Sequence, residues 1–181
     1  ARELYAALYL NYPIVLTRDL ARAKAWVRSK VRGTERAGVL ASSKAKRLRS
    51  VGIWVNVQRD PVAWFLNAPA NADASCFLEV PATEFEGQGL EIDYGLLAWD
   101  ADLRYCNGGF DYFDCRGARW MHVNKEQGQR YLKNAYRVLL TRARQGLVIF
   151  VPDGDPDDET RRPEYYDGTY AYLKSLGLQE I

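Results

Sequence analysis

Several residue patterns that define common protein classes are rare or missing in this sequence of 181 residues. No apolar run approaches the ~20 residues of a membrane-spanning helix, so we expect no membrane partner. The first residues lack the basic patch and apolar core of a signal peptide. The three cysteines, Cys76, Cys106 and Cys115, form no Cys-x-x-Cys motif, and free thiols in a reducing, cytoplasmic compartment are therefore expected.

Two further motifs are scarce or absent. The single histidine, His122, excludes most histidine-rich metal sites, and a zinc site that combined it with the cysteines would have the wrong ligand spacing. No Gly-x-x-x-x-Gly-Lys-Ser/Thr motif occurs, so the chain has no phosphate-binding loop of the Walker A type. These absences remove the most easily recognised metal and nucleotide sites.

The length and composition are those of one ordinary globular domain. With 48% hydrophobic and 27% charged residues, the chain can bury one core, and 181 residues are not comfortably enough for two domains. We therefore expect a single domain over residues 1–181. The chain begins at Ala1 in the middle of an amphipathic pattern, so we also expect it to be a piece of a longer protein.

The net charge of +2 hides an uneven distribution of charges. Residues 18–49 contain eleven lysines and arginines but only two acids, whereas residues 153–164 contain six acids and two arginines. A basic block in a balanced domain is typical of a protein that binds a polyanion. A solvated helix face would have the same composition, and both interpretations stay open.

Apolar runs alternate with amphipathic segments along the chain. The runs at residues 14–16, 37–41, 76–80, 94–99 and 147–151 predict strands, and the segments at 4–9, 20–32, 44–50, 61–66, 131–145 and 163–176 predict helices. A turn at 107–109 leads into residues 110–123, which form either a hairpin or an irregular insertion. The alternation predicts an α/β fold, in which helices cover both faces of a parallel sheet.

The most informative stretch is residues 131–151. Apolar residues in its first part recur at three- and four-residue intervals, which predicts one buried helix face. They are Leu132, Tyr136, Leu139 and Ala143. Gly146 stands where a glycine would end this helix, and the five apolar residues after it predict a strand covered on both faces. Arg137, Arg142 and Arg144 would then lie on the helix, where a rigidly held guanidinium is suited to contact a phosphate.

Three loops carry polar groups that could bind a ligand. Residues 82–93 combine glycines, which let a backbone approach a ligand closely, with polar side chains. Residues 42–47 place hydroxyls and cations at a predicted helix amino terminus, where an anion is stabilised, although a merely capped helix is the alternative. Residues 141–144 hold two arginines, for which a salt-bridged helix face is the alternative. We expect all three at the carboxyl ends of the parallel strands, where ligands gather.

Together, two of these loops resemble known motifs. TEFEGQGLEIDY, followed about fifty residues later by NAYRVLLTRARQGLVIFVP, is similar to motifs V and VI of superfamily 1 helicases. With PIVLTRDLARAKAWV, AGVLASSKAKRL, DPVAWFLN, WDADLR and YYDGTYAYLKSLG, nearly the whole chain resembles the C-terminal part of the Schlafen group 3-type DNA/RNA helicase domain. The resemblance implies a RecA-like sheet of the P-loop NTPase fold that lacks its own P-loop.

The resemblance also implies roles for individual residues. Arg142, in Thr-Arg-Ala, is similar to the arginine finger that reaches the γ-phosphate and offsets charge in the transition state. Glu91, in Gly-Leu-Glu, is similar to the carboxylate that accepts a hydrogen bond from the nucleotide ribose. The other implied contacts are Gln88 and Gly89 with the nucleotide, and Thr83, Ser42, Ser43 and Arg47 with the bound strand.

The same resemblance implies the cofactors and partners of the chain. ATP and Mg²⁺ would be bound mainly by an N-terminal RecA-like domain of the same protein, which carries the Walker A and B motifs. The polymer would be single-stranded DNA or RNA. The chain would be the second motor domain of a helicase or translocase, and alone it would not hydrolyse ATP.

Two alternatives of other classes stay open. The basic block would also suit a nucleic-acid-binding module without motor function. Asp100 and Asp102, which end an apolar strand, could join Glu91 around two cations in a metal-dependent nuclease. Tryptophans could stack on bases, but Trp26 and Trp99 lie in apolar patterns that predict core positions.

Overall fold

The computed structural model describes residues 3, 7, 11–55, 60–67, 71, 73–86 and 91–181. The amphipathic helix expected at residues 4–9 falls almost entirely outside these residues. None of the helices in the described part of the chain has both the length and the apolar character needed to cross a bilayer.

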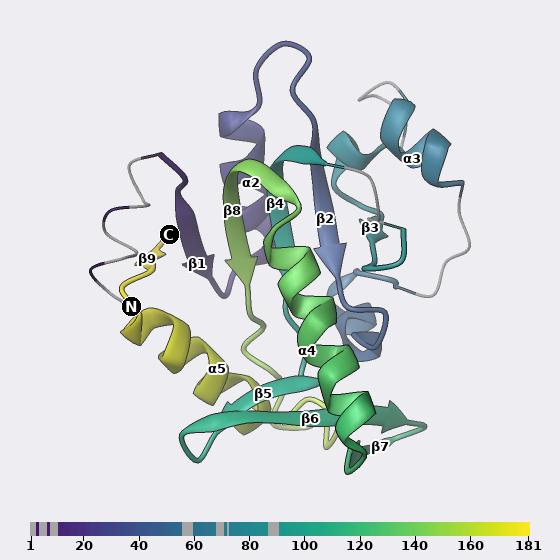
Figure 1. Ribbon diagram of the computed structural model, residues 1–181, viewed down its shortest axis with the longest axis vertical. Helices are drawn as coiled ribbons and strands as arrows, with labels where there is room; N and C mark the ends of the chain where they lie inside the picture. Colours follow the sequence, from purple (N-terminus) through teal and green to yellow (C-terminus); the bar gives the residue numbers. More distant parts are fainter. Residues whose placement is uncertain are drawn as a thin grey trace.

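In the described part of the chain, six strands form the main sheet, which Figure 1 shows. They are β1 (Ile14–Thr17), β2 (Ala37–Ala41), β3 (Pro81–Ala82), β4 (Ile92–Ala98), β8 (Ala143–Phe150) and β9 (Gln179–Glu180), in the spatial order β3-β2-β4-β8-β1-β9. Every pair of neighbours in this order is parallel. The predicted α/β fold is therefore confirmed, and its sheet has the RecA-like arrangement.

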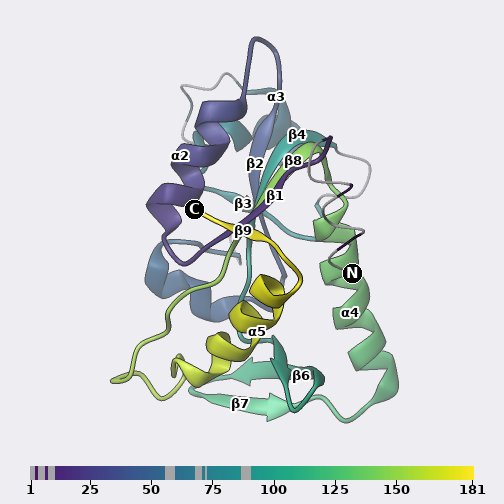
Figure 2. The same cartoon turned by 90° about the vertical axis from the view of Figure 1, so that its left-hand side faces the viewer.

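Helices cover both faces of this sheet (Figure 2). The helices are α2 (Leu20–Lys30), α3 (Pro61–Leu66), α4 (Glu126–Leu140) and α5 (Glu164–Ser175), with 3₁₀ helices at Lys46–Val51 and Ser75–Phe77. Alternate strand residues face opposite sides: Val39 and Val148 belong to the core under α2, whereas Leu40 and Ile149 belong to the core under α4 and α5. Because both faces are buried, the strands read as continuous apolar runs.

A second, antiparallel sheet lies below the carboxyl ends of the main strands (Figure 1). It contains β5 (Leu103–Cys106), β6 (Gly109–Arg116) and β7 (Arg119–His122) in that order. Asn107 and Gly108 both have positive φ, as a two-residue hairpin turn requires. The antiparallel pairing of β6 with β7 confirms the hairpin alternative for residues 110–123. The sheet is attached to α5, because the Tyr105 N–H donates to Thr169 Oγ1 at 2.9 Å and the rings of Tyr105 and Tyr172 stack with centroids 3.9 Å apart.

Two predicted elements differ in type. The strand expected at 76–80 is instead a 3₁₀ turn followed by bends, because Leu78 adopts a left-handed backbone with φ of 65° that an extended strand excludes. The helix expected at 44–50 is a 3₁₀ helix that begins at Lys46 without a side-chain cap. Ser42 Oγ accepts from the Lys44 N–H at 3.1 Å and closes a local turn instead.

The end of α4 is the third difference. The helix stops at Leu140, because Thr141 Oγ1 donates to the last-turn carbonyls, that of Val138 among them, at 3.0 Å. Ala143 to Gly146 already belong to β8, so the helix cap predicted at Gly146 is wrong. A Cβ on Gly146 would lie 3.2 Å from atoms of Pro13 and Tyr94, so this glycine allows close packing within the sheet.

Candidate functional site

The predicted site residues lie at two opposite edges of the main sheet. The arrows of β1, β2 and β8 in Figure 1 point toward the second sheet, and β4 is parallel to β2 and β8. The carboxyl edge of the main sheet therefore faces the second sheet, and the amino edge lies at the other end. Ser42, Ser43 and Thr83 follow strands and lie at the carboxyl edge, but Glu91 and Arg142 precede β4 and β8. The expectation that all three loops lie at the carboxyl ends is therefore wrong for residues 141–144, since a segment before a parallel strand must lie at its amino end.

Glu91 and Arg142 are neighbours across two strands. The Ile92 N–H donates to the Arg142 carbonyl at 3.2 Å, and Ile92 pairs with Ala143 in the sheet register. Glu91 forms an ion pair with Arg144, Nε to Oε2 3.7 Å, in which both side chains are about two-thirds exposed. Ion pairs this exposed contribute little free energy, so the Glu91 carboxylate remains available to a ligand.

The Nε–H group of Arg142 has no hydrogen-bond acceptor among the described residues. Its side chain is half-buried, and its Nε is fully buried without a hydrogen-bond partner. Within the described ranges it forms no ion pair. A buried donor without an acceptor costs about 1–3 kcal/mol, and more when the group is charged. None of the described residues supplies the missing acceptor.

The local fold fixes the backbone on both sides of Arg142. Thr141 ends α4 through its hydroxyl, as described above. Ala143 is buried against Gly95 of β4, where an added Cβ would lie 3.2 Å from the Ala143 methyl. The Thr-Arg-Ala sequence therefore combines a helix end, an arginine at the edge and a small residue that lets two strands approach.

Gln145, to which the sequence assigned no role, connects segments of the amino edge through hydrogen bonds. Its Nε2 donates to Glu35 Oε1 and Asp93 Oδ1, both at 3.0 Å, and Tyr94 donates to its Oε1 at 3.3 Å. Three segments meet at this one amide. The sequence carried no signal for the contacts, because Glu35 is 110 residues away from Gln145.

At the carboxyl edge, Glu84 joins three segments that the resemblance did not connect. Its carboxylate accepts from the Ser43 N–H at 2.9 Å, from the Ser43 hydroxyl at 2.6 Å and from the Tyr131 hydroxyl at 2.5 Å. Burial and the hydrogen bond to Glu84 raise the pKa of Tyr131 to about 12, so its phenol stays neutral. Ser43 is therefore fixed against α4 by a carboxylate that sequence reasoning missed.

The other residues predicted to contact a nucleic acid bind to the protein itself. Ser42 and Thr83 are buried, and Thr83 donates to Glu86 Oε2 through both its N–H and its hydroxyl. Arg47 donates to Asp158 Oδ2 at 2.8 Å through its guanidinium. Gln88 and Gly89 lie outside the described residues.

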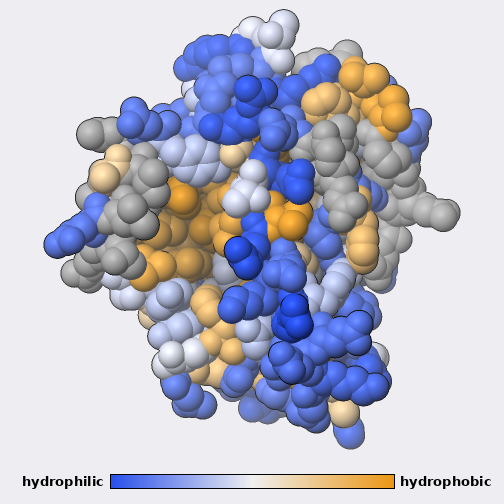
Figure 3. Space-filling view, in the orientation of Figure 1, coloured by the Kyte–Doolittle hydropathy of each residue, from blue (hydrophilic) through white to orange (hydrophobic). Residues whose placement is uncertain are grey.

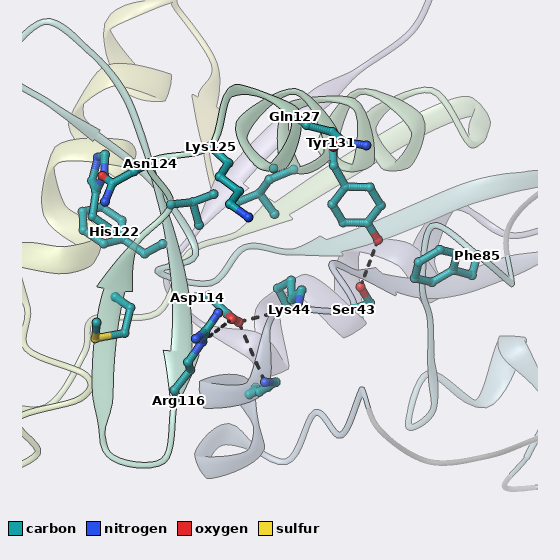
Figure 4. A pocket seen from close by; sticks show the side chains of 16 residues that line it. Ser43, Lys44, Phe85, Asp114, Arg116, His122, Asn124, Lys125, Gln127 and Tyr131 are labelled. Carbon is teal, nitrogen blue, oxygen red and sulfur yellow. Dashed lines mark hydrogen bonds and ion pairs between the residues drawn. The ribbon is translucent and has the colours of Figure 1, made fainter.

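A groove runs between α4 and the β6–β7 hairpin at the carboxyl edge (Figure 4). Its volume is about 970 Å³. Tyr131 and Ser43 lie on one side of it and Asp114 and Arg116 of the hairpin on the other, while Phe85 and His122 lie toward opposite ends. The residues that line it include four cations, Lys44, Lys46, Arg116 and Lys125.

The basic block of the sequence is divided by the fold. Three of its cations are neutralised by distant acids: Arg18 pairs with Asp153 and Asp167, Lys24 with Glu79, and Arg47 with Asp158. Lys44 and Lys46 also approach a distant acid, Asp114, at 3.6 and 3.9 Å, but they share this one carboxylate and line the groove. The block is therefore partly a paired surface and partly a groove wall.

Asp100 and Asp102, the acids of the nuclease alternative, are buried under aromatic residues. Tyr136 donates to Asp102 at 2.5 Å and Tyr166 donates to Asp100 at 3.0 Å. Burial, together with the nearby charge of Asp100, raises the pKa of Asp102 to about 7. Glu91 lies at the other edge, and within the described residues no three His, Cys, Asp or Glu side chains are grouped to hold a metal ion. The geometry does not bring the proposed nuclease carboxylates together.

The parallel sheet and the helices on both of its faces define a RecA-like α/β fold. A sequence model of the family described as "Schlafen group 3, DNA/RNA helicase domain" matches residues 2–153. The chain belongs to this family, and its role is therefore related to that of nucleic-acid helicases. No curated protein matches the chain, and no solved structure does.

Proposed function

We propose that the chain is the second motor domain of an ATP-dependent DNA or RNA helicase or translocase. In this proposal Arg142 contacts the γ-phosphate of ATP and Glu91 accepts from the ribose, while a preceding RecA-like domain with Walker motifs holds most of the nucleotide. The observation that carries it is the buried, unpartnered Nε of Arg142 beside the exposed Glu91, in a member of a helicase family.

The chemistry asked of Arg142 is electrostatic. ATP supplies the phosphoryl group when bound, and a fixed guanidinium offsets the negative charge that develops during its transfer. Backbone constraints at Thr141 and Ala143 hold the arginine in place before the nucleotide arrives, which reduces the cost of ordering it. Mg²⁺ is assigned to the preceding domain, because the described residues of this chain offer no grouped ligands for it.

The carboxyl edge is assigned to single-stranded DNA or RNA. Ser43 lines the groove there, and Ser42, Thr83 and Arg47 support the backbone behind it through the contacts described above. Gln88 and Gly89, in the segment that joins β3 to β4, are proposed to couple the nucleotide at one edge to the strand at the other. The solvent side of α4, which runs between the edges, is hydrophilic (Figure 3) and carries Arg130, Lys133 and Arg137.

The test is the substitution Arg142→Ala in the full-length protein. ATP turnover should fall by about 10³–10⁵-fold, the range typical of arginine fingers, while nucleotide affinity changes much less. Arg144→Ala is the matched control, because this arginine is two residues away, exposed and paired with Glu91. Wild-type turnover by the Arg142→Ala protein would disprove the arginine-finger role.

A nucleic-acid-binding module without motor activity is the second candidate, and the cation-lined groove favours it equally. It predicts that the full-length protein binds single strands in a salt-dependent manner but shows no ATP turnover that depends on Arg142. Measuring turnover and binding on the same preparation separates the two candidates.

A further inference from the structure

We infer that the groove between α4 and the β6–β7 hairpin is the binding site for the bases and phosphates of a single-stranded nucleic acid, with Phe85 as its stacking surface and Arg116 as a phosphate contact. The inference deepens the function proposed above and rests on it. It assigns the polymer to residues of the β6–β7 hairpin, which the helicase motifs did not indicate, and to Phe85, which lies within the TEFEGQGLEIDY stretch but to which the resemblance gave no role.

Charge is the first argument. Among the described residues that line the groove, Asp114 is the one carboxylate, whereas Lys44, Lys46, Arg116 and Lys125 are cations. A groove with this excess of positive charge is complementary to a polyanion and concentrates it locally.

Asp114 does not neutralise the positive charge of the cations around it. Its carboxylate has Arg116 Nε at 3.1 Å and the amines of Lys44 and Lys46 at 3.6 and 3.9 Å. Although burial alone would raise it, the Arg116 hydrogen bond and the lysine charges hold the pKa of Asp114 below its ordinary value. One carboxylate thus gathers three cations and cannot neutralise them, so two positive charges are left for phosphates.

An exposed aromatic ring is the second argument. Phe85 is 61% exposed, and its ring stacks on that of Tyr131 with centroids 6.0 Å apart and planes 29° apart. Tyr131 is in turn fixed by its hydrogen bond to Glu84. One face of a rigid aromatic pair is therefore open to solvent at the end of the groove. Aromatic faces beside cationic grooves are the recurring means of holding unpaired bases without sequence preference.

The cations of the groove and the exposed ring together favour one class of ligand. An acidic peptide would satisfy the cations but would leave the ring exposed, and duplex nucleic acid has no free base to stack on it. A single strand uses both, because its phosphates and its unpaired bases alternate along the chain. DNA and RNA share this chemistry.

The experiment measures binding of fluorescein-labelled oligo-dT and oligo-U to the full-length protein by fluorescence anisotropy over a range of salt concentrations. Phe85→Ala should weaken binding by about 5- to 150-fold, the loss of one stacked base. Arg116→Ala should weaken binding and reduce the slope of log affinity against log salt by about 0.7, the value for one phosphate contact on a single strand.

Two controls match these residues in exposure but lie outside the groove. Leu66 of α3 is also 61% exposed, and Arg22 of α2 has a side chain 70% exposed against 74% for Arg116. Leu66→Ala and Arg22→Ala should bind as the wild type does. Thermal unfolding of all four variants shows whether each is folded, since none of the substituted side chains is buried.

Wild-type affinity in both the Phe85→Ala and the Arg116→Ala protein overturns the inference, as does competition by polyglutamate as strong as that by unlabelled oligonucleotide. A preference for one of the two labelled oligonucleotides that is reduced in the Phe85→Ala or the Arg116→Ala protein supports the groove and shows which polymer it favours. Failure of the motor proposal would be seen in a different measurement, as an absence of ATP turnover that depends on Arg142. The two failures can be told apart, because the groove variants leave the amino edge, and so Arg142, unchanged.

Discussion

The amino and carboxyl edges of the main sheet treat charge in opposite ways. At the amino edge, Arg142 forms no ion pair with the described residues, and the ion pair between Glu91 and Arg144 is exposed. At the carboxyl edge, the Arg47 guanidinium pairs with Asp158, although its Nε, like that of Arg142, is buried without a hydrogen-bond partner, and Glu84 accepts three hydrogen bonds. The two edges therefore differ in their ion pairs: more of the charge at the carboxyl edge is paired within the described residues, and we expect an external anion at the amino edge.

The largest expected effect comes from disabling each edge separately. Arg142→Ala should reduce ATP turnover by about 10³–10⁵-fold and leave oligonucleotide affinity unchanged in the absence of nucleotide. Phe85→Ala should reduce oligonucleotide affinity and leave the turnover measured without oligonucleotide unchanged. Both quantities are measured on the same full-length preparations, so each variant is the control for the other.

The comparison of the edges fails if the effects do not separate. Should Arg142→Ala weaken oligonucleotide binding as much as Phe85→Ala does, the two edges would form one continuous site. The assignment of the nucleotide to the amino edge and of the nucleic acid to the carboxyl edge would then be wrong.

The next largest effect concerns the buried acids behind the carboxyl edge. The pKa of Asp102 is about 7 in the folded protein against an ordinary value of 3.8, because the group is buried and Asp100 is close. Between these pH values the folded state keeps a proton that the unfolded state has lost, so stability decreases as pH rises through this window. A pKa difference of this size corresponds to a contribution to the free energy of unfolding on the order of 4 kcal/mol.

Asp102→Asn tests this prediction, because asparagine has nearly the same shape, carries no charge and can still accept from Tyr136. Urea denaturation between pH 5 and pH 8, a range chosen to span the upper part of the window, should show a smaller loss of stability in the variant than in the wild type. Equal pH dependence in the two proteins would mean that Asp102 is not protonated in the folded state.

The sequence predicted the fold better than it predicted the site, for a physical reason. Strands such as β2 and β8 are buried on both faces, so burial left a continuous apolar run that is visible without any partner. The role of Gly146 depends instead on Pro13 and Tyr94, which belong to distant segments and would lie 3.2 Å from a Cβ added to this glycine. No local pattern distinguishes a glycine that ends a helix from one that lets strands approach.

The sequence suggested residues for the site but not their geometry. Glu91 was assigned to the nucleotide through resemblance alone, and Arg142 through resemblance and through its expected place on a buried helix; the structure adds that the two are neighbours across two strands. Their position at the amino edge could have been deduced, because both precede a strand. The role of Glu84 could not, since its partners Ser43 and Tyr131 are 41 and 47 residues away along the chain.

A smaller effect is expected from removing the half-buried ion pair at the carboxyl edge. The side chains of Arg47 and Asp158 are 29% and 27% exposed, so their interaction is less screened than one at the surface. Arg47→Ala should lower the free energy of unfolding by about 1–2 kcal/mol, partly through lost packing of its stem. Asp158 would keep its bond to Arg161, which limits the loss. An unfolding midpoint equal to the wild type's would show that Arg161 alone is sufficient.

The smallest expected effect is at the amino edge, where the matching ion pair is exposed. Glu91 and Arg144 are 3.7 Å apart, and water competes for both charges. Arg144→Ala should therefore change the free energy of unfolding by less than about 0.5 kcal/mol, measured by the same urea titration as for Arg47→Ala. A loss as large as that of Arg47→Ala would mean that Glu91 is held by the fold itself. Glu91 would then be unavailable to a ribose, and the amino edge would be as complete within the chain as the carboxyl edge is.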